Sequence, residues 1–340
     1  MLEISKLWIK RIKCLPQIHK MTKLPKDAVK CLDKGFVRLV DSMGGDDAIV
    51  QSARVSYGKG TSKVSQDRGL IRYLMRHRHT TPFEMVEFKF HCKMPIFVAR
   101  QWVRHRTANI NEYSLRYSEA RDEFYYPESK HIQFQSALNK QGRSGNVPKQ
   151  LTDKVMKYFK EISERSFDMY KELNEAGLAR ELIRAILPVN LYTEWYWKND
   201  LHNLLHFIGL RSDSHAQYEI RVYSDAMAKA VKKVAPFAWE AYQDYVVSGI
   251  RFSRIEQSLL EQRLPDRVID DVLEDVVYQI TATLHNNKRR EDADLFLLYQ
   301  KQGGSDSEDD FKLKWSSGEI EIGNVRELRE FKTKLKRLKK

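Results

Sequence analysis

The segment from Val86 to Trp102 constrains the fold of this chain more than any other part of the sequence. It begins with apolar side chains at every second position: Val86, Phe88, Phe90 and Cys92. Polar residues fill the positions between them, and this alternation predicts a strand with one buried face. Met94-Pro95 is expected to end the strand. Pro95 has a fixed φ that suits the first turn of a helix from residue 96 to about residue 105.

The remaining spacing predicts a mixed α/β (α+β) protein. Strand patterns occur at residues 35–40 and 191–197. Helical patterns occur at residues 48–57, 66–78, 150–174, 179–187, 200–210 and 215–234. Few strand–helix–strand repeats are present, so we expect mainly antiparallel pairing, in a sheet that helices flank.

Composition divides the chain into three parts. Residues 1–30 form a basic extension, residues 31–248 a compact domain, and residues 249–340 a charged, largely helical extension. In the last part, an acidic break at residues 303–310 precedes a basic helix with apolar residues on one side: Leu328, Phe331, Leu335 and Leu338. That helix suits a partner, an anionic surface or another subunit, and a solvated helix is the plain alternative. The residues predict no function for either extension.

The net charge of +13 and the pI near 9.4 raise the possibility of nucleic-acid binding, because a basic surface attracts phosphate polyanions. Much of the charge lies in the tails. Residues 1–26 carry seven Lys or Arg against one acid, and residues 326–340 carry eight against two. Zinc-finger spacing and RNA-binding signatures are missing, so a site for small phosphorylated ligands is favoured over nucleic acid.

Cysteine content and hydropathy indicate where in the cell the protein is located. The three cysteines, Cys14, Cys31 and Cys92, are odd in number and scattered, which fits neither a disulfide framework nor a zinc site. They indicate a reducing compartment, so we expect a cytoplasmic protein. No run of about 18 uncharged apolar residues occurs, and no membrane-spanning helix is expected.

The densest polar segment follows the apolar helix at residue 96. Four arginines lie within seventeen residues: Arg100, Arg104, Arg106 and Arg116. Arginine suits bidentate contact with phosphate and keeps its charge when buried. A solvated basic helix end is the alternative. The apolar run Ile96-Phe97-Val98-Ala99 argues against it, because it places the helix in a core and lets the arginines emerge from a rigid element.

Within this segment, Arg104-His105-Arg106, seven further residues and then Ser114 resemble the signature of flavin-dependent thymidylate synthases. Similar blocks surround it in order: residues 81–84, 95–102, 111–118, 187–193 and 210–217. The resemblance runs from about Asp33 to Val246. It implies that family's fold, a homotetramer with sites built from several subunits, and methylation of dUMP to dTMP. FAD is the implied cofactor, with 5,10-methylenetetrahydrofolate as one-carbon donor and NADPH as hydride source.

Position by position, the resemblance implies two sets of contacts. The FAD contacts would be His79, Thr81, Arg104, His105, Arg106, Glu112, Asp200, Leu201, His202 and His206. The dUMP contacts would be Gln101, Trp102, Val103, Arg104, Glu112, Tyr113, Ser114, Leu115, Arg116, Arg184 and Arg211. Some family members carry Asn, Arg and Asn where this chain has Asp200, His202 and His206. That departure leaves the flavin contacts of this helix open.

Two routes can activate C5 of uracil. One adds a cysteine thiolate to C6, and no cysteine here is placed for activation. The other stabilises the ionised ring with a fixed cation, and the resemblance implies Arg211 for that catalytic role. Pairing of Arg211 with Asp213 or Glu219 is the structural alternative. Ser114 has the residue type of a nucleophile but no evident general base, so we interpret it as a dUMP-binding hydroxyl.

Other readings of the sequence remain open. A basic nucleic-acid-binding protein or another flavin-dependent NADPH oxidase on the same fold are the rival functions. No Gly-x-Gly-x-x-Gly follows a strand, which excludes a Rossmann site. His202 and His206 have the spacing of a helical zinc pair, but Asn203 replaces the Glu of the metalloprotease pattern and no third ligand is evident. We therefore expect no metal site.

Overall fold

The computed structural model describes residues 24–55, 67–137, 140–288, 307–317 and 325–338. The chain forms two compact units. The first contains residues up to 42 together with residues 87–230, and the second contains residues 43–86 together with residues from 231 onward. Each unit is described by itself. Among the described residues, none of the helices has the length and apolar character needed to cross a membrane.

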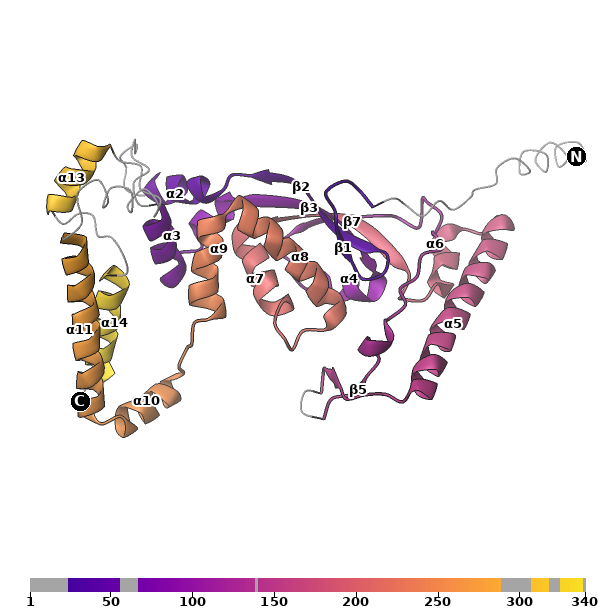
Figure 1. Ribbon diagram of the computed structural model, residues 1–340. Coiled ribbons are helices and arrows are strands. Elements are labelled where there is room, and N and C mark those ends of the chain that lie inside the picture. Colours follow the sequence, from indigo (N-terminus) through magenta and orange to yellow (C-terminus); the bar gives the residue numbers. More distant parts are fainter. Residues whose placement is uncertain (1–23, 56–66, 138–139, 289–306, 318–324, 339–340) are drawn as a thin grey trace, which may run out of the picture. The chain divides into compact units, whose positions relative to one another are not determined.

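A five-stranded sheet forms the centre of the first unit (Figure 1). Its strands, in the spatial order β1-β2-β3-β7-β4, are β1 (Val29–Cys31), β2 (Gly35–Met43), β3 (Glu87–Pro95), β7 (Tyr192–Asp200) and β4 (Asn109–Glu112). β1 pairs antiparallel with β2, and β7 pairs antiparallel with both β3 and β4. The predicted mixed fold with an antiparallel-rich sheet is confirmed.

Strand β3 has the predicted buried face. Phe88, Phe90 and Cys92 are fully buried, whereas Lys89 between them is exposed. The prediction that Met94-Pro95 ends the strand is confirmed, because the ladder stops at Pro95, opposite Tyr192. Proline is tolerated at a strand end in extended conformation. Helix α4 (Ile96–Trp102) begins immediately after it.

Helix α4 ends earlier than predicted, at Trp102. The amides of Arg104 and His105 donate to the carbonyls of Gln101 and Trp102, so the last turn tightens to three-residue spacing. Trp102 is fully buried and lies at the centre of an aromatic core. Its ring contacts those of Trp195, Trp197, Phe207 and Tyr223. These rings come from β7 and from helices α7 (Leu201–Arg211) and α8 (Tyr218–Val234).

Helix α8 begins at Tyr218, and the prediction of residue 215 was wrong. Asp213 accepts a hydrogen bond from the backbone N–H of His215, which makes a local turn that delays the helix. Asp200 lies before α7 rather than within it, and its side chain accepts from the backbone N–H of Asn203. It therefore acts as the N-cap of that helix.

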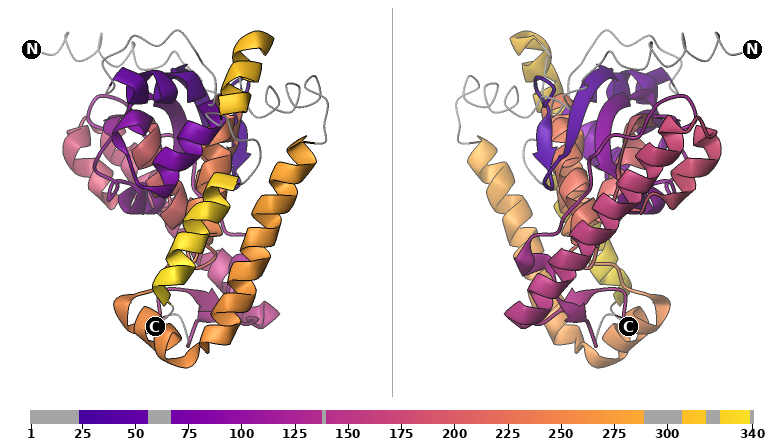
Figure 2. Two further views of the ribbon diagram at one scale, coloured as in Figure 1. Left: turned by 90° about the vertical axis from the view of Figure 1, so that its left-hand side faces the viewer. Right: turned by 90° about the vertical axis from the view of Figure 1, so that its right-hand side faces the viewer.

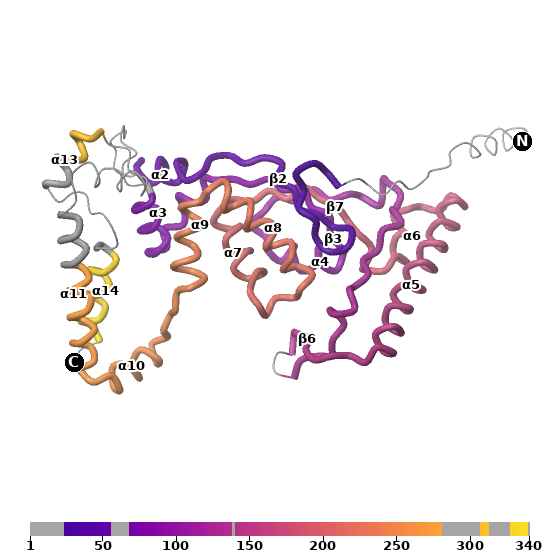
Figure 3. The backbone as a smooth tube through the Cα atoms, viewed as in Figure 1, coloured from indigo at the N-terminus to yellow at the C-terminus, as the bar shows by residue number. Residues whose placement is uncertain are grey.

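A second cluster of the first unit surrounds Phe167 and Tyr170. It involves helix α5 (Lys149–Glu175) and helix α6 (Arg180–Ile183), and the turn η3 (Arg184–Ile186) follows α6. The turn η2 (Ser129–His131) and the hairpin of β5 (Phe134–Gln135) and β6 (Arg143–Ser144) precede α5. Figure 3 shows the path of the backbone from this hairpin into α5. The predicted helix at residues 150–174 is confirmed.

The second unit is helical. Its elements are α2 (Asp46–Val55), α3 (Asp67–Arg76), η1 (Thr81–Met85), α9 (Pro236–Tyr242), the π-helix η4 (Gln243–Val247), α10 (Arg254–Arg263), α11 (Asp266–Lys288), α13 (Glu308–Ser317) and α14 (Val325–Leu338). Asp46 accepts from the amides of Phe237 and Ala238 at 2.8 and 2.9 Å and so caps α9.

Helices α11 and α14 lie side by side (Figures 1 and 2). Ile269, Val276 and Leu335 are buried between them. Leu328 and Leu338 pack there as predicted, whereas Phe331 is exposed. The predicted acidic break at residues 303–310 was wrong for its last part, since Glu308, Asp309 and Asp310 form the first turn of α13, where the helix dipole favours acids. Its first four residues lie outside the described part of the chain.

Candidate active site

The segment after α4 places exposed cations beside a rigid core. Arg104 and Arg106 are exposed, and neither makes an ion pair with any described residue. Trp102 anchors the helix end from which they project. Cations fixed without acidic partners leave room for an anionic ligand such as a pyrophosphate or phosphate.

His105 points inward from the same segment. Its ring lies edge-on to Phe207 at 4.9 Å and near His206 at 6.0 Å. Nε of Arg211 donates to its Nε2 at 3.1 Å. Burial, with the nearby charge of Arg211 and then His206, lowers the pKa of His105 to about 4. The imidazole is therefore neutral at pH 7, and its Nε2 acts as an acceptor.

Arg211 is the last residue of α7 and is held by this bond. Burial lowers the pKa of Arg211, although a guanidinium remains charged at neutral pH. Neither alternative partner pairs with it: Asp213 binds His215 at 2.8 Å, and Glu219 binds Arg143 at 2.8 Å. Among the described residues, only Nε of Arg211 is engaged, so the two terminal nitrogens can face a ligand.

A relay of side chains orients Gln101. Buried Glu219 accepts from Gln217 Nε2 at 2.9 Å, and Gln217 accepts in turn from Gln101 Nε2. A carboxylate can only accept, so it fixes which way the Gln217 amide points. That choice leaves the carbonyl oxygen and one N–H of Gln101 for a ligand.

Glu219 is itself tightly held. Its Oε1 accepts from Tyr125 OH at 3.0 Å and from Arg143 Nη2 at 2.8 Å, and only 2% of its side chain is exposed. Burial alone raises the pKa of Glu219, but the hydrogen bond and charge of Arg143, with Gln217, lower it on balance. Arg143, Gln217 and Glu219 were missed as site residues. The Gln217 block was recognised, but Arg143 comes from a distant hairpin that no pattern connects to it.

The loop after β4 is shaped by its own hydrogen bonds. Ser114 Oγ accepts from the amide of Arg116 at 3.3 Å, and the Ser114 carbonyl accepts from the amides of Tyr117 and Ser118. Within the described chain, no histidine or carboxylate bonds the Ser114 hydroxyl. Glu112 accepts from Thr193 Oγ1 at 2.6 Å, which ties β4 to the sheet. The amide of Tyr113 donates to the Glu194 carbonyl at 2.8 Å.

Arg116 and Arg184 meet at one acidic residue. Arg116 pairs with the Glu181 carboxylate at 3.3 Å, and Arg184 Nε donates to the Glu181 carbonyl at 3.3 Å. Arg116 and Glu181 also line an open cavity of about 420 Å³ with Tyr117 and Arg180. The structure thus brings two of the predicted dUMP arginines together.

The second predicted flavin segment has mixed surroundings. Asp200 uses both carboxylate oxygens on Asn203, and Leu201 is fully buried. His202 is half-buried and His206 is exposed, next to His105. In the described part of the chain, no cluster of three or more His, Cys, Asp or Glu could hold a metal ion.

His79 and Thr81 belong to the second unit. Both are exposed, and the His79 ring stacks on Tyr73 at 5.8 Å. Val103 and Leu115 are half-buried in the first unit, whereas Trp102 is wholly buried.

Comparisons with known proteins agree with one another. A family model described as thymidylate synthase complementing protein matches residues 38–237. A flavin-dependent thymidylate synthase of Rickettsia conorii is 54% identical over 241 residues, covering 67% of this chain and 82% of that protein. One from Wolbachia pipientis wMel is 47% identical over 273 residues, covering 80% of this chain and 92% of that protein.

Two solved structures are also similar to this chain. The UMP/dUMP methylase PolB from Streptomyces cacaoi, bound with 5-Br UMP, has a TM-score of 0.57 and 35% identity, over 62% of this chain and 94% of that chain. Its structure with 5-Br dUMP has a TM-score of 0.58 and 33% identity, over 64% of this chain and 98% of that chain.

Proposed function

This chain belongs to the flavin-dependent thymidylate synthases, as its sequence blocks predicted, and we propose that it methylates C5 of dUMP to give dTMP. It is accordingly a methyltransferase. The observation that carries the proposal is the arrangement at residues 104–106 and 211. There, exposed arginines that make no ion pair with a described residue flank a neutral histidine that holds a partly buried guanidinium.

The proposed one-carbon donor is 5,10-methylenetetrahydrofolate and the proposed hydride source is NADPH. The flavin is proposed to be FAD, and the relatives' name supports a flavin. Bound FAD would supply two-electron transfer between the reduced nicotinamide and the new methyl carbon. This chain's own residues must then bind, orient and polarise the pyrimidine.

The residues present fit an FAD phosphate group. Arg104 and Arg106 offer charge that no described acid neutralises, and both emerge from a helix end fixed by Trp102. We propose that these two arginines and His105 hold the cofactor, with Glu112, His202 and His206 nearby. His79 and Thr81 are proposed to reach it from their own segment. Asp200 would contribute through its backbone, because its side chain caps α7, and buried Leu201 would contribute by packing that helix.

The proposed dUMP site uses a second group of residues. Arg116 and Arg184 would receive the phosphate, displacing contacts to Glu181. Gln101, held by Gln217, would supply directional hydrogen bonds, and Ser114 would supply a hydroxyl. Trp102, Val103, Arg104, Glu112, Tyr113 and Leu115 would complete the site. The similar methylase PolB, solved with 5-Br dUMP, supports a nucleotide of this kind.

Arg211 is proposed as the catalytic residue. Its terminal nitrogens would face N3 and the adjacent carbonyl of uracil, where a fixed cation favours the ionised ring and raises electron density at C5. His105 supports this role because, as a neutral acceptor, it orients Arg211 without repelling it.

A thiol route finds little support in the described cysteines. Burial raises the pKa of Cys31 to about 12, and burial raises that of Cys92 well above its ordinary value. Neither would form a thiolate at neutral pH, and a thiol is a weak nucleophile. Cys14 lies outside the described residues. The two free thiols also support the proposed cytoplasmic location.

We further propose a homotetramer, as the family resemblance implies. Apolar side chains are exposed on the first unit: Ile110, Tyr117, Leu182, Val189, Tyr196 and Leu210. Such side chains suit burial at a subunit interface. Sedimentation equilibrium of the full chain tests this, and a monomer at micromolar concentration would contradict it.

The function is tested by incubating the purified chain with [5-³H]dUMP, 5,10-methylenetetrahydrofolate and NADPH. We expect a yellow protein that releases tritium and forms dTMP in equal amounts. A yellow protein that oxidises NADPH without releasing tritium would be an oxidase and would overturn the proposal. A colourless protein that is retained on nucleic acid at low salt would overturn it as well.

A further inference from the structure

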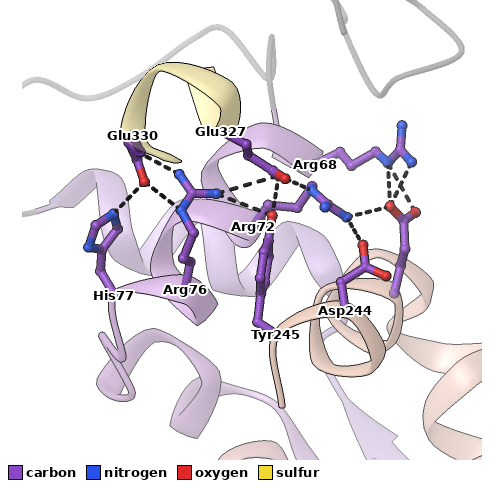
Figure 4. Close-up of polar contacts among 9 residues, drawn as sticks. Arg68, Arg72, Arg76, His77, Asp244, Tyr245, Glu327 and Glu330 are labelled. Atoms are coloured by element: carbon purple, nitrogen blue, oxygen red, sulfur yellow. Dashed lines mark hydrogen bonds and ion pairs between the residues drawn. The ribbon is translucent and has the colours of Figure 1, made fainter. Parts of the chain in front are cut away.

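Helix α14 contacts helix α3 through a partly buried cluster of charges, drawn in Figure 4. α3 carries Arg68, Arg72 and Arg76 at four-residue intervals, so the three guanidinium groups follow one face of the helix. Their acidic partners come from two directions within the second unit, α9 with η4 and α14.

The first group of acidic partners lies on α9 and η4, at the end of the matched family region of residues 38–237 and just after it. Glu240 binds Arg68 at 2.6 Å and Arg72 at 2.7 Å, and Asp244 binds Arg72 at 2.7 Å. Arg72 also donates to Glu327 of α14 at 2.9 Å. Arg72 would therefore keep acidic partners if α14 moved away.

Arg76 is different, because its acidic partners among the described residues both lie on α14. Its Nε and Nη2 donate to the two carboxylate oxygens of Glu330 at 2.7 and 2.8 Å, and its Nη1 lies 3.4 Å from Glu327. The side chains of Arg76 and Glu330 are 12% and 26% exposed. A bidentate pair with so little exposure is stronger and less screened than an ordinary surface pair.

Tyr245 of η4 completes the contact. The guanidinium groups of Arg72 and Arg76 lie 4.9 and 5.4 Å from the centre of its ring, within cation–π range. Its hydroxyl donates to Glu327 and accepts from Arg76 Nη1 at 3.2 Å. The arginine–glutamate pairs and the ring and hydroxyl of Tyr245 thus hold α14 at one place on α3. The α11 side chains Ile269 and Val276 hold α14 from its other side.

The end of α3 is rigidly connected to His79. The amide of His79 donates to Leu74 O at 2.9 Å and the amide of Arg78 donates to Met75 O at 3.2 Å. With Arg78 at φ +59°, these bonds form a Schellman cap. Glu330 also lies 3.3 Å from His77 Nε2, inside the capped turn. The Arg76–His77 turn and the His79 amide therefore belong to one hydrogen-bonded cap, and Thr81 follows two residues later as the first residue of η1.

We propose that Glu330 and Glu327 of α14 are positioning residues for the His79–Thr81 segment: α14, which belongs to the C-terminal extension, fixes the turn that presents this segment to the flavin. The inference rests on the proposed function for the part that concerns flavin. It gives residues 249–340 a role in the reaction that the family match at residues 38–237 does not contain.

The test uses the full chain and two independent readouts. Hydrogen exchange of the His79 amide, followed by mass spectrometry on peptides covering residues 74–81, reports whether the cap opens. Titration with FAD reports affinity. We expect Glu330→Gln to speed exchange and to weaken FAD binding, each by about 5- to 10-fold, through loss of the charge-assisted pair.

Glu274→Gln is the matched control, because Glu274 is exposed on α11 and makes no ion pair with a described residue. It should change either readout by less than about twofold. The double variant Arg76→Glu with Glu330→Arg restores an opposite-charge pair and should recover most of the loss. It also keeps the test decisive if Glu330→Gln folds poorly.

Three results would overturn the proposal. One is exchange in Glu330→Gln equal to that in Glu274→Gln. Another is faster exchange with unchanged FAD affinity, which would make the contact merely structural. The third is a charge-swapped pair that recovers neither readout. A wild-type chain that takes up no flavin would instead refute the proposed function, and the exchange rates would still decide whether α14 holds the turn.

Discussion

Replacing Glu219 by Gln should both destabilise the first unit and disturb the substrate site. The glutamate is 2% exposed and accepts from Tyr125, Arg143 and Gln217 at 2.8–3.0 Å. A glutamine keeps one acceptor for Tyr125 and Arg143 but loses the charge. Its NH₂ group would face the NH₂ group of Gln217, so one of the two amides must turn.

The magnitude follows from these contacts. A hydrogen bond to a charged group contributes about 1.5–3 kcal/mol, and removing one partner of a buried ion pair costs about 3–5 kcal/mol. Because Arg143 is 31% exposed and water can partly solvate it, we expect a loss below the full cost of a broken buried pair, about 2–3 kcal/mol. A turned Gln217 would present a donor to Gln101, so dUMP affinity should fall about 5- to 10-fold.

Urea unfolding monitored by tryptophan fluorescence measures the first effect, since Trp102, Trp195 and Trp197 are buried in the same unit. Glu87→Gln is the control. It breaks an ion pair with Lys198 at 3.0 Å, but the two side chains are 28% and 46% exposed, so the loss should stay below about 1 kcal/mol. Equal unfolding midpoints for the two variants would refute the reasoning.

Further predictions concern the site and the turn after α3. The pKa of His105 falls from 6.5 to about 4 on folding, so the unfolded chain binds more protons than the folded chain between these pH values. The free energy of unfolding should therefore drop by about 1–2 kcal/mol, after screening by solvent, as pH falls from about 6.5 to 4. A His105→Gln variant that shows the same drop would contradict this. Arg78→Gly should stabilise the protein by about 0.5–1 kcal/mol in thermal unfolding, because φ +59° costs glycine little, and a lower melting temperature would count against it. Arg104→Gln and Arg106→Gln should lower the ratio of bound flavin to protein, whereas Lys157→Gln, at an exposed position of α5, should not; fully yellow variants would exclude both arginines as cofactor ligands.

Local elements of this fold are predictable from the sequence where buried side chains recur at a short, regular interval along the chain. β3 is found from alternation alone because its pairing with β7 leaves Phe88, Phe90 and Cys92 on one buried face. Element ends are less predictable. Tyr218 begins α8 late because the Asp213 side chain competes for a backbone amide, and competition of that kind depends on a side-chain rotamer.

Contacts distant in sequence are beyond such patterns. His105 and Arg211 are 106 residues apart, and nothing in the residues near either one indicates that the histidine is neutral and accepts from the arginine. Arg76 and Glu330 are 254 residues apart, and both belong to ordinary amphipathic helices. The family resemblance brought Arg104, Ser114 and Arg211 into one predicted site, but it contained neither the Glu219 relay nor the α14 contact.

The central claim is that the Arg211 guanidinium, held by neutral His105, makes the pyrimidine ring anionic enough to react at C5. The most direct test is tritium release from [5-³H]dUMP by an Arg211→Ala variant whose flavin content is measured in the same sample. We predict full flavin and a loss of at least about 100-fold in release. Release at the wild-type rate from the flavin-loaded variant would contradict the claim.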